Sequence, residues 1–300
     1  MIHLLLTFFL MTVSCWGENS VSPAQIAFER GSIIWIANLD GTNARKIAKG
    51  SAPDLSPDGK RIAFHTDSST KGAVVRRIAV VDVASRNVTF FKEIPSDNCQ
   101  RALWSPDGGR ILFHIWAESD WHIAMIKRDG SDFRYVRKAA PERNSYWSTC
   151  WSPDGKSFYA QDLSNLYQFD LEGKELKKWK LDSLFPGGSM NSGSSISVSP
   201  DGERLLLDID MNDEEANMPD WNGPPPSVWS LDLAAKKATR LTPKGMVASE
   251  GCWLDDKRIL FVAQSAKETE PTIYKLKLGE KKWTPLLKNA SNPSVSGRSD

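Results

Sequence analysis

The tetrapeptide Ser-Pro-Asp-Gly recurs four times along this 300-residue chain, and no other feature limits the possible folds as strongly. The copies lie at 56–59, 105–108, 152–155 and 199–202, at intervals of 49, 47 and 47 residues. Proline presets φ at the first central position of a tight turn, and glycine supplies the positive φ that lets antiparallel strands continue from it. Because a short apolar run such as Arg61–Phe64 follows the turn sequence, each copy predicts a β-hairpin.

A fifth, degenerate copy occurs at Trp253–Lys257. It lacks both the proline and the glycine and is one residue shorter than the others. We therefore expect Asp255-Asp256 to form a two-residue turn at this point.

A second series of β-rich segments has the same period. These segments begin at Ile34, Ile78, Ile123, Leu166, Val228 and Ile273, at steps of 44, 45, 43, 62 and 45 residues. Turn residues follow each segment, and then comes another short strand. Four strands in a unit of forty-odd residues are typical of a propeller blade. The series predicts six blades.

The two ends of the chain complete each other. The first segments after residue 24 match strands two to four of a blade, at 26–28, 32–39 and 45–48. The missing first strand is found at Ser291–Ser296, which corresponds residue for residue to Ser51–Ser56. We find no linker, composition shift or helical periodicity after residue 24. The sequence therefore predicts an all-β fold: one six-bladed β-propeller of four-stranded antiparallel blades over 24–300, closed by pairing of its C-terminal and N-terminal strands.

The first residues read as a targeting segment. Leu4–Val13 is a ten-residue apolar run, which is too short to cross a bilayer as a helix. We interpret residues 1–17 as a signal peptide. A lipoprotein signal ending before Cys15 is the alternative, with lipid attached to that cysteine. Both interpretations predict an exported protein, periplasmic or extracellular, that is either soluble or lipid-anchored.

Composition excludes several classes of function. Lysine plus arginine is 38 and aspartate plus glutamate is 37, so the formal net charge is +1. This balance gives no electrostatic footprint for nucleic acid or an anionic membrane surface, and no later segment is apolar enough to span a membrane. Cys99, Cys150 and Cys252 lack the paired spacing of metal ligands, so we expect thiols packed in the core.

The Trp-Ser-Pro-Asp-Gly units at 104–108 and 151–155 resemble the TolB-type (WD40-like, PD40) repeat, and the resemblance covers roughly 24–300. It implies a six-bladed propeller. In TolB such a propeller follows an α/β domain and works in the periplasm with the peptidoglycan-associated lipoprotein. Here the predicted signal runs directly into blade strands, so we expect that domain to be absent.

Similar blades occur in serine peptidases of the prolyl oligopeptidase type and in oligogalacturonate lyases. This chain has no Gly-x-Ser-x-Gly nucleophile elbow, which argues against a peptidase.

Two loop expansions indicate where a binding site lies. The connections that precede the first strand and those between the second and third strands share one face of a propeller. The longest of each kind in this chain, roughly 181–193 and 210–226, both belong to the fourth blade. We expect them to meet on the functional face, because loops on a rigid scaffold commonly carry binding residues.

Aromatic side chains are expected on the same face, where they suit a protein partner or the apolar face of a sugar. We expect the tryptophans of the first strands to pack between blades instead, namely Trp104, Trp151 and Trp253. The candidates for contact with a partner are Trp116, Trp121, Tyr146, Trp147, Phe185 and Trp221.

Two further groups of residues carry charge or oxygen atoms that suit a cation. Asp208–Glu215 has oxygen ligands at alternate positions, but the EF-hand glycine and closing glutamate are missing, which favours a solvated acidic loop over a calcium site. Arg101 and Glu250 lie three residues before Trp104 and Trp253, near the expected mouth of the channel. They either hold a charged group of a ligand or face water.

A ring of equivalent second-strand positions invites a metal interpretation. Related lyases use histidine and glutamine around a metal, but equivalent positions around a ring do not converge on one ion. We therefore expect neither a metal site nor catalytic residues there. The residues in this ring are Glu29, His65, His114, Gln161 and Asp208.

The sequence favours an exported, non-catalytic binding propeller with no cofactor and no metal. Its expected partner is a protein or cell-envelope component, with an envelope lipoprotein or a glycan among the candidates, and we expect a monomer. The alternative function is a polysaccharide-active enzyme of the oligogalacturonate-lyase kind using the same face.

Overall fold

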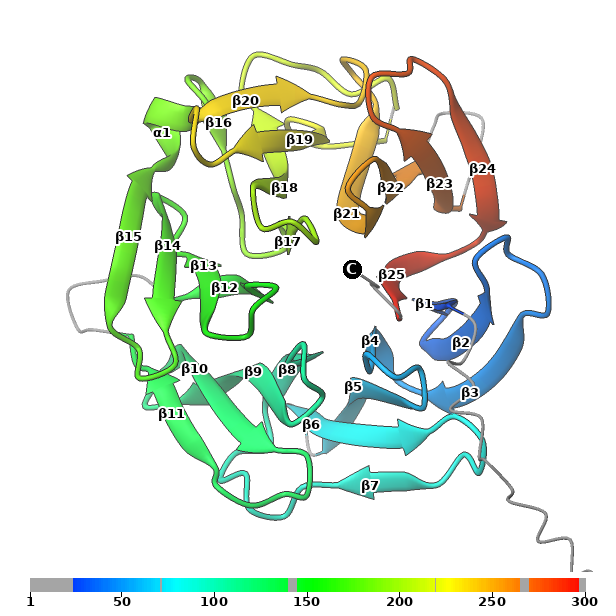
Figure 1. Ribbon diagram of the computed structural model, residues 1–300, viewed down its shortest axis with the longest axis vertical. Helices are drawn as coiled ribbons and strands as arrows, with labels where there is room; N and C mark the ends of the chain where they lie inside the picture. Colours follow the sequence, from blue (N-terminus) through cyan, green and yellow to red (C-terminus); the bar gives the residue numbers. More distant parts are fainter. Residues whose placement is uncertain (1–23, 71, 140–144, 219, 265–269, 297–300) are drawn as a thin grey trace, which may run out of the picture.

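The chain folds into a ring of six β-sheets around a central channel (Figure 1). The computed structural model describes residues 24–70, 72–139, 145–218, 220–264 and 270–296. This architecture confirms the predicted six-bladed propeller. The predicted signal peptide and Cys15 lie outside the described residues.

The blades are numbered in the order of their first strands. Blade 1 contains β4 (Ser51–Leu55), β5 (Arg61–Thr70), β6 (Ala73–Asp82) and β7 (Val88–Phe90). Blade 2 contains β8 (Cys99–Trp104), β9 (Arg110–Ala117), β10 (Asp120–Lys127) and β11 (Arg134–Arg137). Blade 3 contains β12 (Trp147–Trp151), β13 (Ser157–Gln161), β14 (Asn165–Asp170) and β15 (Glu175–Lys180). Blade 4 contains β16 (Gly188–Ser189), β17 (Ile196–Val198), β18 (Arg204–Met211), β19 (Pro226–Asp232) and β20 (Lys237–Arg240). Blade 5 contains β21 (Val247–Asp255), β22 (Arg258–Gln264), β23 (Thr272–Lys277) and β24 (Trp283–Lys288). Blade 6 contains β25 (Ser291–Val295), β1 (Gln25–Glu29), β2 (Ile33–Asn38) and β3 (Arg45–Lys49).

Blade 4 departs from the four-strand pattern, because β16 and β17 both pair with β18 and share the place of the first strand. A short helix, α1 (Leu181–Leu184), precedes β16. No helix in the described part of the chain is long and apolar enough to cross a membrane.

The four Ser-Pro-Asp-Gly segments form the predicted hairpin turns. In the first, the Gly59 amide donates to the Ser56 carbonyl at 2.8 Å, and Gly59 has φ of +69°. The Asp58 carboxylate accepts a hydrogen bond from the Ser56 hydroxyl at 2.6 Å. The same hydroxyl accepts the Arg61 amide at 2.9 Å, so one serine ties the turn to the strand after it. The other three copies repeat the serine–aspartate contact.

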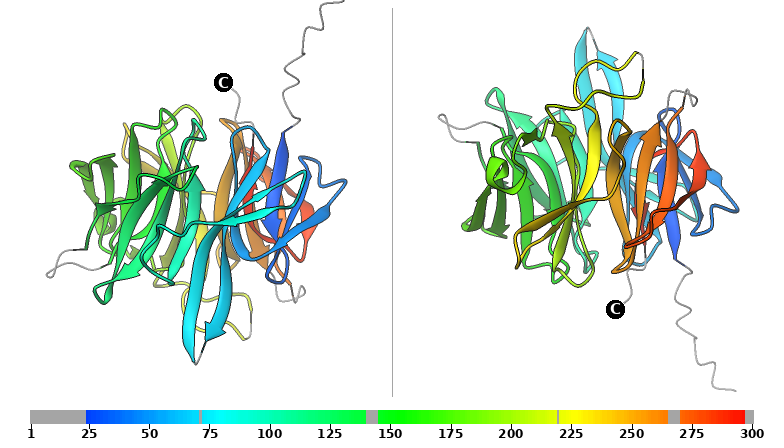
Figure 2. Two further views of the ribbon diagram at one scale, coloured as in Figure 1. Left: turned by 90° about the horizontal axis from the view of Figure 1, so that it is seen from below. Right: turned by 90° about the horizontal axis from the view of Figure 1, so that it is seen from above.

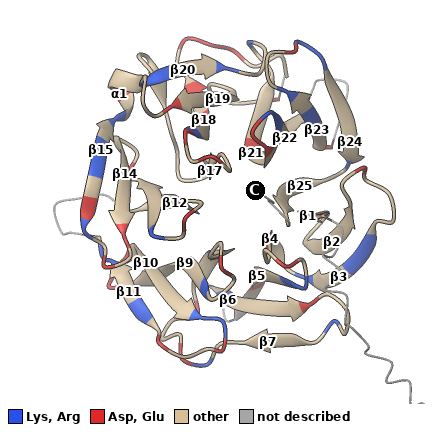
Figure 3. Cartoon of the chain, in the orientation of Figure 1, with Lys and Arg blue, Asp and Glu red and all other residues tan. Residues whose placement is uncertain are grey.

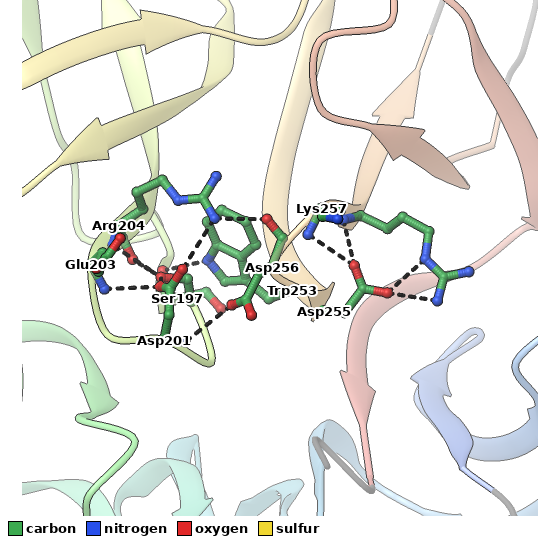
Figure 4. A network of polar contacts seen from close by, with 10 residues as sticks. Ser197, Asp201, Glu203, Arg204, Trp253, Asp255, Asp256 and Lys257 are labelled. Carbon is green, nitrogen blue, oxygen red and sulfur yellow. Dashed lines mark hydrogen bonds and ion pairs between the residues drawn. The ribbon is translucent and has the colours of Figure 1, made fainter. Parts of the chain in front are cut away.

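The degenerate turn is displaced by one residue from the prediction. Asp255 pairs with Arg258, so Asp256-Lys257 forms the two-residue turn and Asp255 ends β21. Figure 4 shows how this turn contacts blade 4: Asp256 accepts the Asp201 amide at 3.0 Å and Arg204 Nη2 at 2.7 Å. The turn therefore remains bonded to its neighbour without proline or glycine.

Closure of the ring follows the prediction. β25 pairs antiparallel with β1, with Ile26 opposite Val295 and Ala27 opposite Ser294. The Ser294 hydroxyl donates to Asp54 at 2.8 Å and accepts the Leu55 amide at 3.0 Å, which joins the closing strand to blade 1 as well.

The core lies between neighbouring sheets. Trp104, Trp151 and Trp253 are 6%, 7% and 0% exposed, which confirms that they pack between blades. The Trp253 indole donates to the Ser197 carbonyl of blade 4 at 3.2 Å. The cysteines of the described chain are buried and not disulfide-bonded, as expected, and their residues are Cys99, Cys150 and Cys252.

The two faces of the disc differ. One carries the Ser-Pro-Asp-Gly turns and is called the turn face. The other, called the loop face, carries the connections between second and third strands. Figure 2 shows the β5–β6 hairpin and the yellow loop that follows β18 projecting from the same face. Figure 1 places these two elements in blades on opposite sides of the channel. Lys and Arg mix with Asp and Glu around the ring (Figure 3).

Candidate functional site

The central channel forms a cavity of about 520 Å³ that is lined by residues from the inner strands of all six blades. At its loop-face end the lining residues define what we call the channel mouth: Ala52, Arg101, Gly193, Ser195, Glu250 and Asn292. The predicted position of Arg101 and Glu250 near this mouth is confirmed.

A repeated bulge shapes the mouth. The pairing of first and second strands shifts register next to Ala52, Arg101, Ser148 and Glu250, and each of these residues has φ between +49° and +58°. Asn292 repeats the conformation in β25, with φ of +51°. A β-bulge leaves a residue outside the ladder, so its amide needs another acceptor when buried.

Carboxylates from neighbouring second strands accept some of these amides. Glu29 Oε2 accepts the Ala52 amide at 3.0 Å and Asn292 Nδ2 at 3.1 Å. Asp208 Oδ2 accepts the Ser195 amide at 2.9 Å and the Glu250 amide at 3.0 Å. Acidic side chains beneath the mouth are therefore part of the construction of the bulges.

Blade 5 lacks such an acid, and this changes the role of Glu250. In β22 the position opposite the residue before the bulge is Val262, which cannot accept a hydrogen bond. The Asn292 amide of the next blade is bound by Glu250 Oε2 instead, at 2.5 Å. Glu250 is therefore held at the mouth itself, where it lines the cavity.

Arg101 extends across the mouth. It begins on β8 of blade 2, and its Nη2 donates to the Gly193 carbonyl ahead of β17 in blade 4, at 2.9 Å. This is the only hydrogen bond of its guanidinium within the described chain, and it forms no ion pair there. A guanidinium has five N–H donors, so most of them are available to a group in the cavity.

Burial and like charge shift the pKa values of these groups. Burial raises the pKa of Glu250 to about 7. Repulsion from Asp208 and Glu29 acts in the same direction, whereas the Asn292 amide and the charge of Arg101 lower the pKa. Burial also raises the pKa of the Asp208 carboxyl, against the hydrogen bonds it accepts and the charge of Arg101. The arginine pKa is lowered by burial, although Glu250 and Asp208 oppose that change.

Two histidines beneath the mouth stay neutral. Burial together with the charge of Arg101 lowers the pKa of His114 to about 3. Burial also lowers the pKa of His65 to about 4, where the charges of Arg76 and Arg101 act in the same direction and Asp67 opposes them. His114 is 1% exposed, and neither of its ring nitrogens has a hydrogen-bond partner in the described structure. They add no charge to the mouth near neutral pH.

Three tryptophans form a cluster on the loop face. The Trp116 and Trp121 rings pair across the β9–β10 hairpin with centroids 5.5 Å apart, and Trp147 lies 6.1 Å from Trp121. Trp116 is 39% exposed, whereas Trp121 is 8% exposed. The name aromatic cluster is kept below for Trp116, Trp121 and Trp147. Trp221, in the loop after β18, is 37% exposed.

Three of the predicted aromatic residues are buried, namely Trp121, Tyr146 and Phe185. Tyr146 is fully buried against Tyr167 and Phe169, and its hydroxyl accepts Arg137 Nε at 3.0 Å. Phe185 is 3% exposed and packs edge-on against Trp229. The expectation that these three side chains face a partner is corrected. Tyr146 and Phe185 fill space between neighbouring sheets, and Trp121 packs against Trp116 and Trp147. The sequence pattern does not show this packing.

The two predicted loop expansions lie together, as expected. Gly188 of β16 pairs with Met211, and the Asn212 amide donates to the Gly187 carbonyl at 3.0 Å. Asn191 Nδ2 donates to Asp210 at 2.8 Å. Glu214 forms an ion pair with Arg240, which holds the second loop against β20.

The sequence did not predict how the second-strand residues take part in the mouth. Strand pairing confirms that Glu29, His65, His114 and Gln161 occupy equivalent positions. Asp208 and Glu29 bind the bulge amides, and the sequence signal for this was the recurrence of polar residues in otherwise apolar strands. Within the described residues, no group of three or more His, Cys, Asp or Glu side chains is placed to hold a metal ion.

Comparisons with known proteins identify the fold. No protein-family model matches this chain, and no curated protein sequence matches it. The structure is similar to TolB from Acinetobacter baumannii, with a TM-score of 0.65, 17% identity and coverage of 92% of this chain and 67% of that one. It is also similar to a TolB-assigned protein from Agrobacterium tumefaciens, with a TM-score of 0.63, 17% identity and 89% of each chain covered.

An oligogalacturonate lyase from Vibrio parahaemolyticus has the same kind of propeller, with a TM-score of 0.54, 16% identity and coverage of 85% of this chain and 75% of that one. Since proteins of different function share these blades, the fold alone does not fix what the protein does. The chain has a TolB-like six-bladed propeller fold.

Proposed function

We propose that this protein is an exported, non-catalytic binding propeller that recognises a protein or another cell-envelope component through its loop face. The observation that carries the proposal is the exposed Trp116 ring of the aromatic cluster, which shares that face with the two contacting loops of blade 4 and the projecting β5–β6 hairpin. The similarity to TolB propellers supports a periplasmic or extracellular setting.

The chemistry of the face suits recognition. Trp116 presents an exposed ring whose orientation is fixed by Trp121, so little side-chain entropy is lost when a partner covers it. The two blade 4 loops on the same face are held by hydrogen bonds and an ion pair. A surface that is already ordered loses less conformational entropy when a partner binds.

Capture of a partner tests this proposal. The purified protein is immobilised, exposed to a cell-envelope extract, and the retained components are quantified by mass spectrometry. We expect Trp116→Ala and Trp221→Ala each to reduce capture of the same component about tenfold or more, as truncation of a central aromatic contact does. Leu176→Ala is the matched control, because Leu176 is 49% exposed on the outer strand β15.

Equal capture by the three variants and the unchanged protein would contradict the assignment of the loop face. The second candidate function is a polysaccharide lyase, which the similarity to oligogalacturonate lyase favours. Incubation with oligogalacturonate distinguishes the two, because a lyase forms an unsaturated product that absorbs in the ultraviolet. Formation of that product by the unchanged protein would replace the binding proposal.

A further inference from the structure

The charges at the channel mouth do not balance. Glu250 lies within the electrostatic influence of two other carboxylates, Asp208 and Glu29, and of one cation, Arg101. If all three carboxylates were ionised, the cluster would carry two negative charges in excess. His65 and His114 are neutral and cannot supply the difference.

We propose that the channel mouth beside Glu250 receives a cationic group from the partner, a lysine ammonium, an arginine guanidinium or a chain N-terminus, which neutralises this excess. The inference rests on the proposed function, in that a partner approaches the loop face, but the cation site is tested without that partner.

The acceptors for such a group are already in place. One Glu250 oxygen accepts the Asn292 amide, and the other has no hydrogen-bond partner in the described chain. Asn292 donates its Nδ2 to Glu29, which leaves its Oδ1 as a second acceptor. Both residues line the 520 Å³ cavity, so an ammonium entering it meets one charged and one neutral oxygen.

Other occupants fit the mouth less well. An anion would pair with Arg101 but would add to the excess of negative charge around it. A metal ion needs several ligands in one place, and the described residues offer no group of three suitable side chains. An ammonium or guanidinium adds charge without a fixed coordination number.

Binding of a cation is coupled to release of a proton from the Glu250 carboxyl. Glu250 faces Arg101 from β8, Asp208 from β18 and Glu29 from β1, together with the neutral Asn292 of β25. Its pKa of about 7 means that roughly half of the Glu250 carboxyls are protonated near neutral pH. A cation favours the ionised form, so binding releases a proton and strengthens as the pH rises through 7.

The experiment uses the full chain and a short acetylated, amidated peptide with one lysine among glycine and serine residues. The matched peptide has norleucine in place of lysine, a third has aspartate, and n-butylammonium is the free small cation. Affinity and proton release are measured by calorimetry in two buffers of different ionisation enthalpy, at about pH 8.5 and about pH 5.5, on either side of the Glu250 transition.

We expect the lysine peptide to bind about tenfold more tightly than the norleucine peptide at the higher pH, and the preference to shrink at the lower pH. Glu250→Gln, which keeps an oxygen for the Asn292 amide, should abolish the preference and the proton release. Glu175→Gln on the exposed strand β15 should leave both unchanged. Binding of n-butylammonium with the same dependence on Glu250 would show that the free cation suffices and would also support the site.

The inference is overturned if the norleucine or aspartate peptide binds as well as the lysine peptide, if none binds at millimolar concentration, or if Glu250→Gln retains the preference. These results would leave capture of an envelope partner through Trp116 unaffected. Conversely, loss of partner capture in Trp116→Ala says nothing about the lysine peptide, so the two proposals fail separately.

Discussion

At the scale of single residues, the protein places ionisable groups where water cannot fully solvate them. Arg101 and Glu250 occupy bulge positions, and the carboxylates of Asp208 and Glu250 accept the amides of such bulges. The carboxylates that stabilise the bulges are therefore also the charges at the channel mouth. The histidines beneath the mouth are kept neutral by the same burial. Folding stability should therefore depend on pH in opposite directions at neighbouring residues.

The pKa of Glu250 predicts a measurable contribution to stability. In the folded protein the carboxyl keeps its proton up to about pH 7, whereas in the unfolded chain it loses it near the model value of 4.5. The folded state thus binds more protons in this range, and the contribution of Glu250 to the free energy of unfolding falls by up to about 3 kcal/mol as the pH rises through it.

Urea unfolding of the unchanged protein and of Glu250→Gln across this pH range checks the prediction. The variant should gain stability relative to the unchanged protein as the pH rises, and Glu175→Gln should not. The comparison is made between variants because His65 and His114 also change the free energy of unfolding with pH. Their pKa values are lowered in the folded protein, so their contribution is lost as the pH falls below about 6.5, opposite to that of Glu250. Parallel curves for Glu250→Gln and the unchanged protein would contradict the raised pKa.

At the scale of elements, local chemistry determines most of each hairpin. Serine, proline, aspartate and glycine each supply one requirement of the turn, and the structure shows the same contacts in every copy. Where proline and glycine are missing, strand pairing extends to Asp255 and moves the turn by one residue. The sequence analysis did not predict the extension of β5 and β6 beyond their apolar segments. Ion pairs such as Arg76–Asp67 at 3.2 Å join the two strands there.

The turn aspartates should contribute individually to stability. Asp107 accepts the Ser105 hydroxyl and the Gly109 amide, at 2.5 and 2.9 Å, and these hydrogen bonds lower its pKa. Asp107→Ala removes both, and we expect it to destabilise the protein by about 1–2 kcal/mol in chemical denaturation at neutral pH. Asp213→Ala, in the exposed loop after β18, is the control and should have little effect. A loss in Asp107→Ala no greater than that of the control would show that the turn does not depend on the aspartate.

At the scale of the whole molecule, the ring is held closed by strands from opposite ends of the chain. β25 completes blade 6 and also contacts blade 1 through Ser294 and Asp54. At the mouth it supplies Asn292, which bonds to both Glu29 and Glu250. Closure therefore creates the candidate site as well as removing the open sheet edges.

Opening the ring should destabilise the entire disc. Removal of residues from 291 onward exposes the edge of β1 and removes the contact with β4, and we expect association in light scattering and a lowered thermal midpoint. Ser294→Ala is a milder test, since it removes two buried hydrogen bonds and should cost about 1–2 kcal/mol while leaving a closed monomer. Thr284→Ala on the exposed strand β24 is its control. A truncated chain that stays monomeric with an unchanged midpoint would show that the closing strand is dispensable.

The amino-acid pattern was enough to predict the number of blades, the hairpin turns, the closing strand and the interblade position of Trp104, Trp151 and Trp253. These follow from residue spacing and turn chemistry, which depend on neighbours along the chain. The burial of Trp121, Tyr146 and Phe185 and the exposure of Trp116 and Trp221 depend on how the sheets pack in three dimensions. The fold also brings Arg101, Asp208 and Glu250 together from three blades, because packing distances and desolvation between sheets are set by the closed ring and not by any local pattern.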